Sequence, residues 1–327
     1  MVNFYSIYLE KGADIEQKQY EDEDTPLNYT AYRRRDKIVT MLLDHGADVN
    51  TVDFLGHTPL HSAVMHYYDG RRSYLYDRFE RRYLDRFDQR AWFHVEPAKW
   101  GELEAVYPER GESIVRQFLD HGANINARAR DDKTALHIAA ISSGMDGSTS
   151  LLEILLQNGA DVAAVDSEGA TALHYAAATA CTEAVSILLA NGADVDVNSQ
   201  TDTGDTPLIR AVRSRVKNLS TITLLLDHGA NILTCNYNGL TPLHYGVERY
   251  GSETMEGCNI LYDESIVTYL LEHGADPDSK DSRGRTPLDQ ARTNESYSLT
   301  IATNMTINRN GIVKLLLEWE KRMEGLF

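Results

Sequence analysis

The stretch GADVNTVDFLGHTPLH, residues 46–61, contains the two marks that decide the fold of this chain. The first mark is Gly-Ala-Asp at 46–48, and the second is Thr-Pro-Leu-His at 58–61. Between the marks, Asp53 and Gly56 form an Asp-x-x-Gly motif. Asp bonds to nearby backbone and Gly accepts positive φ, so this motif predicts a tight turn.

Both marks recur along the 327 residues. The Gly mark begins at Gly12, Gly46, Gly122, Gly159, Gly192, Gly229 and Gly274, and the Thr mark begins at Thr25, Thr58, Thr134, Thr171, Thr206, Thr241 and Thr286. Each Gly precedes the next Thr by 12 to 14 residues, whereas each Thr precedes the next Gly by 21 to 64. The segment of nearly constant length is expected to set the geometry between neighbouring units, and the variable segment must contain a solvent-facing loop.

The residues around the marks predict two helices in each unit. Thr is a good N-cap, and the Pro that often follows it suits the first helical position. Leu136, Ala139 and Ala140 place small and apolar side chains on one helical face, which favours close packing between helices. A second helix, such as the one containing Phe118, ends at a Gly that can take the left-handed conformation. A single unit cannot bury its apolar face, so the units are expected to stack.

With Gly-Ala-Asp-Val-Asn and Thr-Pro-Leu-His in place, the chain resembles the ankyrin repeat family over essentially residues 1–327, apart from an insertion at about 68–110. The resemblance implies an all-α repeat solenoid of stacked helix pairs with short β-hairpin fingers, and a helical insertion in the second full repeat. The expected boundaries are a half-repeat, 1–24, followed by repeats 25–57, 58–133, 134–170, 171–205, 206–240, 241–285 and 286–327.

Some positions depart from the family pattern. Asp132 stands where the turn Gly is expected, so that finger is predicted to adopt another turn. Asn28, Ile209 and Asp289 replace the His of the first helix. Residues 2–12 resemble a second helix without a first one. Either the chain is a fragment of a longer array, or the aromatic side chains of this segment, Phe4, Tyr5 and Tyr8, contact another molecule.

The largest insertion contains Leu75, Phe79, Tyr83 and Phe87 at every fourth position, flanked by arginines. This spacing predicts an amphipathic helix. Three interpretations stay open: the aromatic stripe packs back on the solenoid, it docks a partner or an acidic surface, or it binds a membrane. Acidic residues within the same segment dilute its positive charge and argue against the last interpretation.

Composition restricts the function further. The 32 basic and 49 acidic residues give a formal net charge of −17, which repels phosphate backbones, so no nucleic-acid partner is expected. No apolar run approaches the roughly 20 residues that span a bilayer. The cysteines, Cys181, Cys235 and Cys258, lack metal-type spacing. Without a secretion signal, the chain is expected in the cytoplasm, with the nucleus open as an alternative.

Most of the histidines, which are common catalytic and metal-binding residues, occupy fixed positions of the repeat. Four histidines occupy the third place after the capping Thr, and four precede the terminal Gly: His61, His137, His174 and His244 in the first set, and His45, His121, His228 and His273 in the second. The family resemblance implies backbone hydrogen bonds for the first set, and the second lies where a helix C-terminus favours a donor. We found no phosphate loop, metalloprotease motif, nucleophile elbow or kinase motif, so we expect no enzyme, no cofactor and no metal.

The resemblance therefore implies a non-catalytic interaction module (a scaffold, adaptor or inhibitor) that binds an unidentified protein on a concave face made by finger tips and first helices. The partner-binding residues expected by this carry-over are Phe54, Leu55, His57, Met65, Arg130, Lys133, Arg213, Tyr237, Leu240 and Arg249. Tyr and Arg are frequent in interface hot spots, although scattered surface residues would look the same. We expect a monomer unless the open half-repeat pairs. The alternative function is the targeting or regulatory portion of a larger enzyme or signalling protein.

Overall fold

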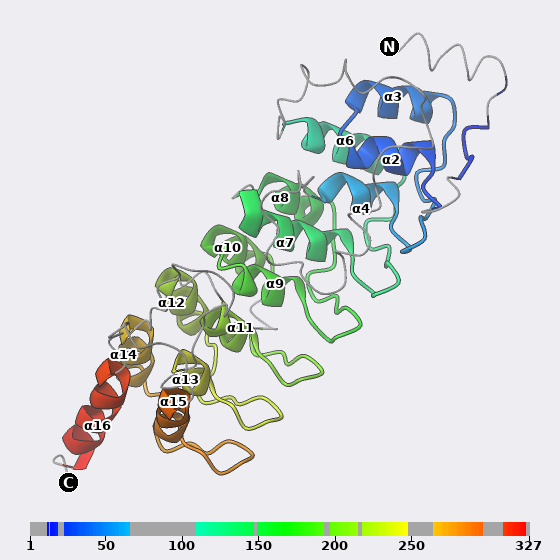
Figure 1. Ribbon diagram of the computed structural model, residues 1–327. Helices are drawn as coiled ribbons and strands as arrows, with labels where there is room; N and C mark the ends of the chain where they lie inside the picture. The colour runs from blue at the N-terminus through cyan, green and yellow to red at the C-terminus, as the bar shows by residue number, and fades with distance from the viewer. Residues whose placement is uncertain are drawn as a thin grey trace, which may run out of the picture. The chain divides into compact units, whose positions relative to one another are not determined.

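The computed structural model describes residues 12, 14–18, 23–65, 109–146, 149–192, 197–214, 218–247, 264–296 and 310–324, to which every structural statement below refers. These residues form fourteen helices and one isolated antiparallel bridge, between Val165 and Thr171 (Figure 1). The chain divides into two compact units, residues 1–161 and 162–327. The all-α repeat architecture expected from the sequence is confirmed.

In the first unit, the helices that follow a Thr mark pack against one another, and so do the helices that precede a Gly mark. The first-helix row comprises α2 (Pro26–Tyr32), α4 (Pro59–Val64) and α7 (Ala135–Asp146). The second-helix row comprises α3 (Asp36–Asp44), α6 (Glu109–Asp120) and α8 (Ser150–Gln157). Each helix of one row also packs on its partner in the other, and this pairing builds the stack.

In the second unit each first helix packs on the next first helix and on its own second helix. Its first-helix row comprises α9 (Ala172–Ala178), α11 (Pro207–Arg213), α13 (Pro242–Gly246) and α15 (Pro287–Ser296). Its second-helix row comprises α10 (Thr182–Ala190), α12 (Leu219–Asp227), α14 (Glu264–Glu272) and α16 (Asn310–Glu324). The helix α16 buries Ile312 and Leu316 and exposes charged residues on its other side.

The first helices start where the Thr marks predict. Thr25 caps α2 by accepting a hydrogen bond from the Asn28 N–H at 3.3 Å, and Pro26 occupies the first helical position. At Thr58, Thr171 and Thr241 the cap is reciprocal, since the His three residues later accepts the N–H of the capping Thr. Histidine takes the place that Glu or Gln holds in a capping box. The Thr and the His of the Thr-x-Leu-His motif therefore act together to fix the start of the helix.

The second helices end where the Gly marks predict. Gly46 has a φ of 86°, and the next residue, Ala47, donates its N–H to the Leu42 carbonyl at 3.0 Å. This is the hydrogen bond of a Schellman motif, which satisfies carbonyls that the helix leaves unpaired. The same bond recurs from Ala123 to Phe118 and from Ala230 to Leu225. The Gly-Ala pair is therefore a helix stop.

Small side chains lie where the first helices meet. Ala31 and Ala63 in the first unit, and Ala176 and Ala177 in the second, are fully buried. The second helices contribute the large side chains, with Phe118 among the largest that are completely enclosed. Burying such a side chain stabilises the fold by roughly 1.5–3 kcal/mol. The alanines thus mark close helix approach, as the sequence predicted.

The large insertion lies between the two helices of one repeat. Helix α4 ends at Val64 and α6 begins at Glu109, so the predicted insertion falls between these two helices. The predicted amphipathic helix with Phe79 and Phe87 lies outside the described residues, as does the half-repeat segment 2–11. The other long gaps between paired helices, such as that between α13 and α14, occupy the same place in their repeats.

The prediction that Asp132 gives its finger a different turn is wrong. Asp132 has a φ of 59°, close to the 78° of Gly56, and its N–H bonds to the Ala129 carbonyl at 3.0 Å as Gly56 bonds to Asp53. Aspartate tolerates the left-handed region better than most residues because its short side chain can bond locally. The turn is therefore preserved at a conformational cost to the residue.

We expect Asp132→Gly to stabilise the first unit by about 0.5–1 kcal/mol, because Gly has no Cβ to clash in the left-handed region. The midpoint of urea unfolding should rise. Asp132→Ala is the control, since it removes the carboxylate and keeps the Cβ. If both variants raise the midpoint equally, the gain comes from the lost charge and the conformational explanation fails.

Candidate protein-interaction site

Six five-residue turns, which we call fingers, extend from the N-terminal ends of the first helices (Figure 1). They comprise residues 53–57 and 129–133 in the first unit, and 166–170, 201–205, 236–240 and 281–285 in the second. Each is closed by two backbone hydrogen bonds, such as Asp53 N–H to the His57 carbonyl at 3.0 Å and Gly56 N–H to the Asp53 carbonyl at 3.0 Å. Two hydrogen bonds within five residues are too few for a strand ladder. In the described chain, the expected hairpins are therefore turns without extended strands.

The first side chain of most fingers holds the turn from within. One carboxylate oxygen of Asp53 accepts the N–H groups of Leu55 and His57, both at 2.8 Å. Asp166 and Asp281 do the same in their own fingers, and the Asn236 amide oxygen replaces the carboxylate in a fourth. Because the turn is locked by its own side chain, its tip is presented in one conformation.

Neighbouring fingers within a unit are also bonded to each other. The Arg130 N–H donates to the Leu55 carbonyl at 2.8 Å in the first unit. In the second unit the same positions pair three times: Asp202 to Glu168, Tyr237 to Thr203 and Ser282 to Asn238, at 2.8–3.1 Å. These bonds hold adjacent tips in register, so side chains on successive fingers keep fixed distances.

The first unit brings most of its predicted binding residues together. Phe54 is 37% exposed, and the Arg130 guanidinium lies 4.5 Å from the centre of its ring. Leu55 is half-buried beside them, and Met65 is half-buried at the C-terminal end of α4. Lys133 forms an ion pair with Asp131 at 2.5 Å.

The remaining predicted residue of this unit, His57, is buried. Its ring lies 3.3 Å from the Asp53 carboxylate, and its carbonyl accepts the Asn28 amide. Of the predicted residues of this unit, Phe54 and Arg130 are therefore the exposed ones, and they contact each other.

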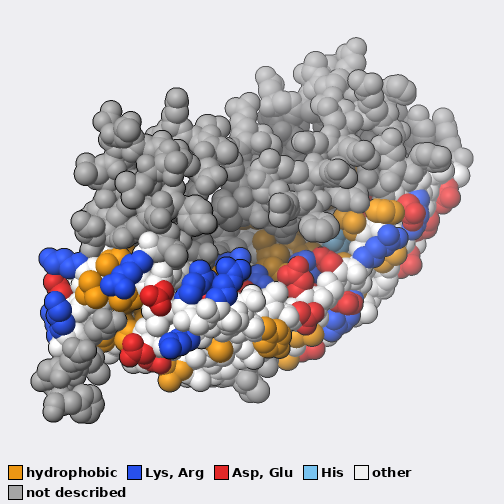
Figure 2. Space-filling view, turned by 60° about the horizontal axis from the view of Figure 1, so that its bottom comes forward, with side chains coloured by type: hydrophobic (Ala, Val, Ile, Leu, Met, Phe, Trp, Pro, Cys, Tyr) orange, Lys and Arg blue, Asp and Glu red, His pale blue; other side chains and the backbone are white. Residues whose placement is uncertain are grey.

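The second unit contains three of the remaining predicted residues, and Arg249 lies outside the described residues. Tyr237 is 70% exposed at its finger tip, the largest fraction among the exposed large hydrophobic side chains. Leu240 is half-buried at the end of the same finger. The Arg213 guanidinium lies 5.5 Å from the centre of the Tyr245 ring. On the face shown in Figure 2, basic and hydrophobic side chains lie next to one another.

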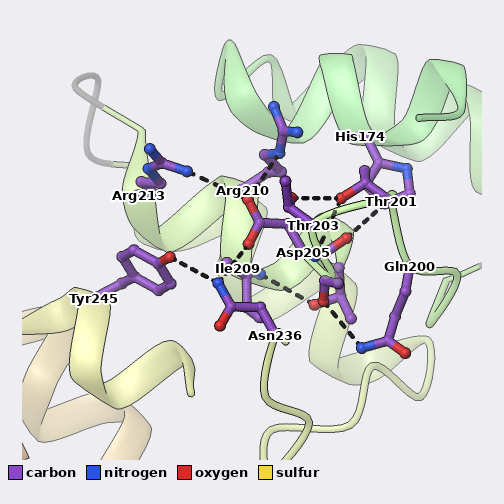
Figure 3. A network of polar contacts seen from close by, with 12 residues as sticks. His174, Gln200, Thr201, Thr203, Asp205, Ile209, Arg210, Arg213, Asn236 and Tyr245 are labelled. Carbon is purple, nitrogen blue, oxygen red and sulfur yellow. Dashed lines mark hydrogen bonds and ion pairs between the residues drawn. The ribbon is translucent and has the colours of Figure 1, made fainter. Parts of the chain in front are cut away.

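A polar cluster around Asp205 was not predicted from the sequence. Figure 3 shows Arg210 and Arg213 directed at the Asp205 carboxylate, with Asn236 linking it to Tyr245. Arg210 and Tyr245, like Tyr175 in the preceding repeat, are the fourth residue after the capping Thr. Recurrence of long polar or aromatic side chains at that position was the available signal.

The repeat histidines have the structural roles that the resemblance implied. His61 accepts the Thr58 N–H on Nδ1 at 3.1 Å, so its proton is on Nε2, which donates to the Lys133 carbonyl at 3.1 Å. His174 and His244 make the same two contacts, to the carbonyls of Asp205 and Arg285. Each ring thus joins its helix to the following finger.

The second set of histidines closes the helix ends. His45, His121, His228 and His273 each place Nδ1 2.7–2.8 Å from the carbonyl four residues earlier. These carbonyls are among the last four of a helix, which have no partner inside it. The donor at this position therefore satisfies a helix terminus while the residue stays exposed.

Burial, together with a smaller contribution from nearby His57, lowers the pKa of His61 to about 4. Burial likewise lowers the pKa of His174 to about 4, with Arg210 adding to the effect. The pKa of Tyr175 is raised by burial and by its hydrogen bond to the Asp166 carboxylate. These shifts follow from structural contacts between repeats and need no catalytic explanation.

The described residues offer neither a metal-binding cluster nor a membrane-spanning helix. No group of three or more His, Cys, Asp or Glu side chains is arranged there to hold a metal ion. None of the helices in that part of the chain is both long enough and apolar enough to cross a membrane.

The fold and the finger geometry agree with the comparison to known families. A model described as "Ankyrin repeats (3 copies)" matches residues 2–76, 103–199 and 194–265, which is more than half of the chain. The chain therefore belongs to the ankyrin repeat proteins. Ankyrin repeats are protein–protein interaction modules, and members of the family are generally non-catalytic.

Individual relatives are similar over parts of their length. The chain is 34% identical over 180 residues to the mouse B-cell lymphoma 3 protein homolog, covering 55% of this chain and 37% of that protein. It is 28% identical over 151 residues to the Xenopus laevis neurogenic locus notch homolog protein 1, covering 46% and 6%. It is 28% identical over 205 residues to the chicken nuclear factor NF-kappa-B p105 subunit, covering 60% and 20%. The chain thus spans well under two thirds of each relative.

Proposed function

We propose that this chain is a non-catalytic scaffold, adaptor or inhibitor that binds a protein partner through its finger tips and the adjoining first helices. The observation that carries the proposal is the exposure of aromatic side chains on turns that are held rigid. Phe54 is stacked by Arg130 on bonded fingers of the first unit, and Tyr237 stands exposed on a bonded finger of the second.

Rigid presentation matters because binding must outweigh the loss of side-chain and loop freedom. The turns that carry Phe54 and Tyr237 are already fixed by internal hydrogen bonds and by their neighbours. Aromatic and Arg anchors at the centre of an interface contribute most of its binding energy. The proposed site therefore combines low ordering cost with the residue types that bind most strongly. The proposal also includes a monomeric chain that acts in the cytoplasm or the nucleus.

The test begins by capturing a partner with the full chain as bait and then compares affinities of point variants. We expect Phe54→Ala and Tyr237→Ala each to weaken binding by about 2 kcal/mol, or roughly thirtyfold, as hot-spot truncations do. Leu233→Ala is the matched control, because Leu233 is an exposed large apolar residue outside the fingers. Isothermal titration calorimetry with the purified partner measures all three.

A further variant tests the competing surface. Phe79 and Phe87 of the insertion are changed to Ala together, and affinity is measured in the same way. If Phe54→Ala and Tyr237→Ala bind like the unmodified chain while the insertion variant loses affinity, the fingers are not the site. Binding would then belong to the insertion.

A further inference from the structure

The finger surface of the second unit carries buried carboxylates beneath exposed guanidinium groups. The side chains of Asp205 and Asp281 are each 2% exposed. Their partners reach solvent to a much greater extent: Arg210 is 23%, Arg213 51% and Arg285 33% exposed. What an approaching molecule meets at these pairs is therefore positive charge, although the chain as a whole carries −17.

Asp205 is fully engaged within the protein. One carboxylate oxygen lies 3.3 Å from both the Arg210 Nε and an Arg213 terminal nitrogen, and the other accepts the Asn236 amide at 3.0 Å (Figure 3). The Asp205 backbone carbonyl accepts from His174. Two guanidinium groups therefore share this one carboxylate.

Arg213 is the more accessible of the two guanidinium groups. Within the described part of the chain, its polar contact is the single one to Asp205, while its face lies over the Tyr245 ring. A guanidinium has five N–H donors in a planar fork, so most of them remain for another acceptor. Tyr245 is held in turn by Asn236, which fixes the platform under Arg213.

We propose that Arg213, stacked on Tyr245, anchors a carboxylate side chain from an acidic segment of the protein partner. This inference rests on the proposed function and specifies the chemistry of the partner at one end of the surface. A guanidinium binds a carboxylate with two parallel hydrogen bonds, which matches the planar fork that Arg213 presents. Tyr237, exposed on the finger that Asn236 begins, supplies an apolar contact for a neighbouring side chain of the same segment.

The surrounding charges indicate where on this surface the acidic residues of the segment would lie. Glu168 and Asp202 are exposed on the two preceding fingers and repel carboxylates there. Arg283 and Arg285 lie on the following finger, beyond Tyr237. The acidic residues of the segment are therefore expected beside Arg213 and toward the finger that precedes α15, away from the tips of the fingers that precede α9 and α11. A nucleic acid carries charge along its whole length, and the acidic chain repels it.

The test uses fluorescein-labelled 12-residue probes and the full chain. One peptide alternates Asp, Glu and Phe, a second replaces each acid by Asn or Gln, and a third probe is a single-stranded DNA 12-mer. Fluorescence anisotropy in low-salt buffer gives the dissociation constants. We expect the acidic peptide to bind at least about tenfold more tightly than the amide peptide, as charge-assisted pairs do. The DNA should bind more weakly than the acidic peptide.

Variants locate the anchor. Arg213→Gln should weaken binding of the acidic peptide about tenfold and leave binding of the amide peptide unchanged, whereas Arg322→Gln, at an exposed position of α16, should change neither affinity. Arg213→Lys keeps the charge and loses the planar fork. Its affinity for the acidic peptide should therefore lie between that of the unmodified chain and that of Arg213→Gln. Circular dichroism verifies that each variant is folded. Equal binding of both peptides, equal effects of Arg213→Gln and Arg322→Gln, or preferential binding of the DNA would overturn the inference.

The outcomes separate this inference from the proposed function. If the captured partner depends on Phe54 and Tyr237 but binds Arg213→Gln as well as the unmodified chain, the proposed function holds and the acidic anchor is wrong. If the partner depends on none of these residues, both are wrong. If it depends on Arg213 and Tyr237 and its affinity falls with added salt, both are supported.

Discussion

Acidification from pH 7.5 to 5 is expected to lower the free energy of unfolding by about 2 kcal/mol for each buried repeat histidine whose pKa lies near 4 in the folded chain. His61 belongs to the first unit and His174 to the second, so both units should lose stability. His244, whose pKa burial also lowers, adds a loss of the same sign.

The sign follows from where the protons bind. An unfolded histidine has a pKa of about 6.5, so between pH 6.5 and 4 the unfolded chain binds more protons than the folded one. The contribution is fully present above pH 6.5 and is lost as the pH falls toward 4. In the folded chain, a proton on Nδ1 of His174 would face the Thr171 N–H that this nitrogen accepts. Protonation therefore breaks the cap of α9 while the bond to the next finger remains.

The control for this prediction is provided by the chain itself. Asn28 occupies the His position in α2 and donates to the His57 carbonyl at 3.0 Å, so Asn can make the bond to the next finger without titrating. His174→Asn should therefore show a smaller decrease of the urea midpoint between pH 7.5 and 5 than the unmodified chain. An unchanged pH dependence in this variant would show that His174 does not contribute to the acid sensitivity.

Gly204→Ala is expected to destabilise the second unit by roughly 3 kcal/mol or more. One part of the cost arises because a residue with a Cβ would have to adopt the left-handed conformation, and the other because that Cβ would overlap with the next finger. Gly204 has a φ of 79°, and a Cβ there would lie 2.6 Å from the Tyr237 backbone nitrogen. Tyr237 would have to move, which would stretch its hydrogen bond to the Thr203 carbonyl. The loss should appear in the urea midpoint and in faster hydrogen exchange at the Tyr237 amide.

A matched glycine separates the two causes. Gly284 has a φ of 76° at the same place in its own finger, but a Cβ there would meet nothing within 4 Å. Gly284→Ala should therefore cost only the conformational part, about 1–2 kcal/mol. The difference between the two variants measures the contact between fingers. Equal losses would mean that the fingers move apart without penalty, and that their register is not tightly fixed.

The fold was predicted from the sequence in considerable detail because its signals are local. A Thr that caps a helix and a Gly-Ala pair that ends one act within about five residues, so the residue types reveal them directly. Repetition removed the remaining ambiguity, since the same pair of marks fixed the helix ends again and again. Phe54 and Tyr237 were expected at finger tips for the same reason, because the turn is specified by Asp-x-x-Gly and its relatives.

The features that only the tertiary structure decided are those that depend on distances between repeats. The sequence did not indicate that Asp132 would keep the turn of a glycine, because that outcome depends on how the whole finger is closed. It did not indicate the cluster in which Asp205, Arg213 and Asn236 meet, since these residues come from two fingers and a helix. The repeat pattern specifies each helix and turn through local backbone preferences. Which long side chains pair across repeats, and which charges remain exposed, follows only from the stacking of those units, which brings residues about 30 positions apart into contact.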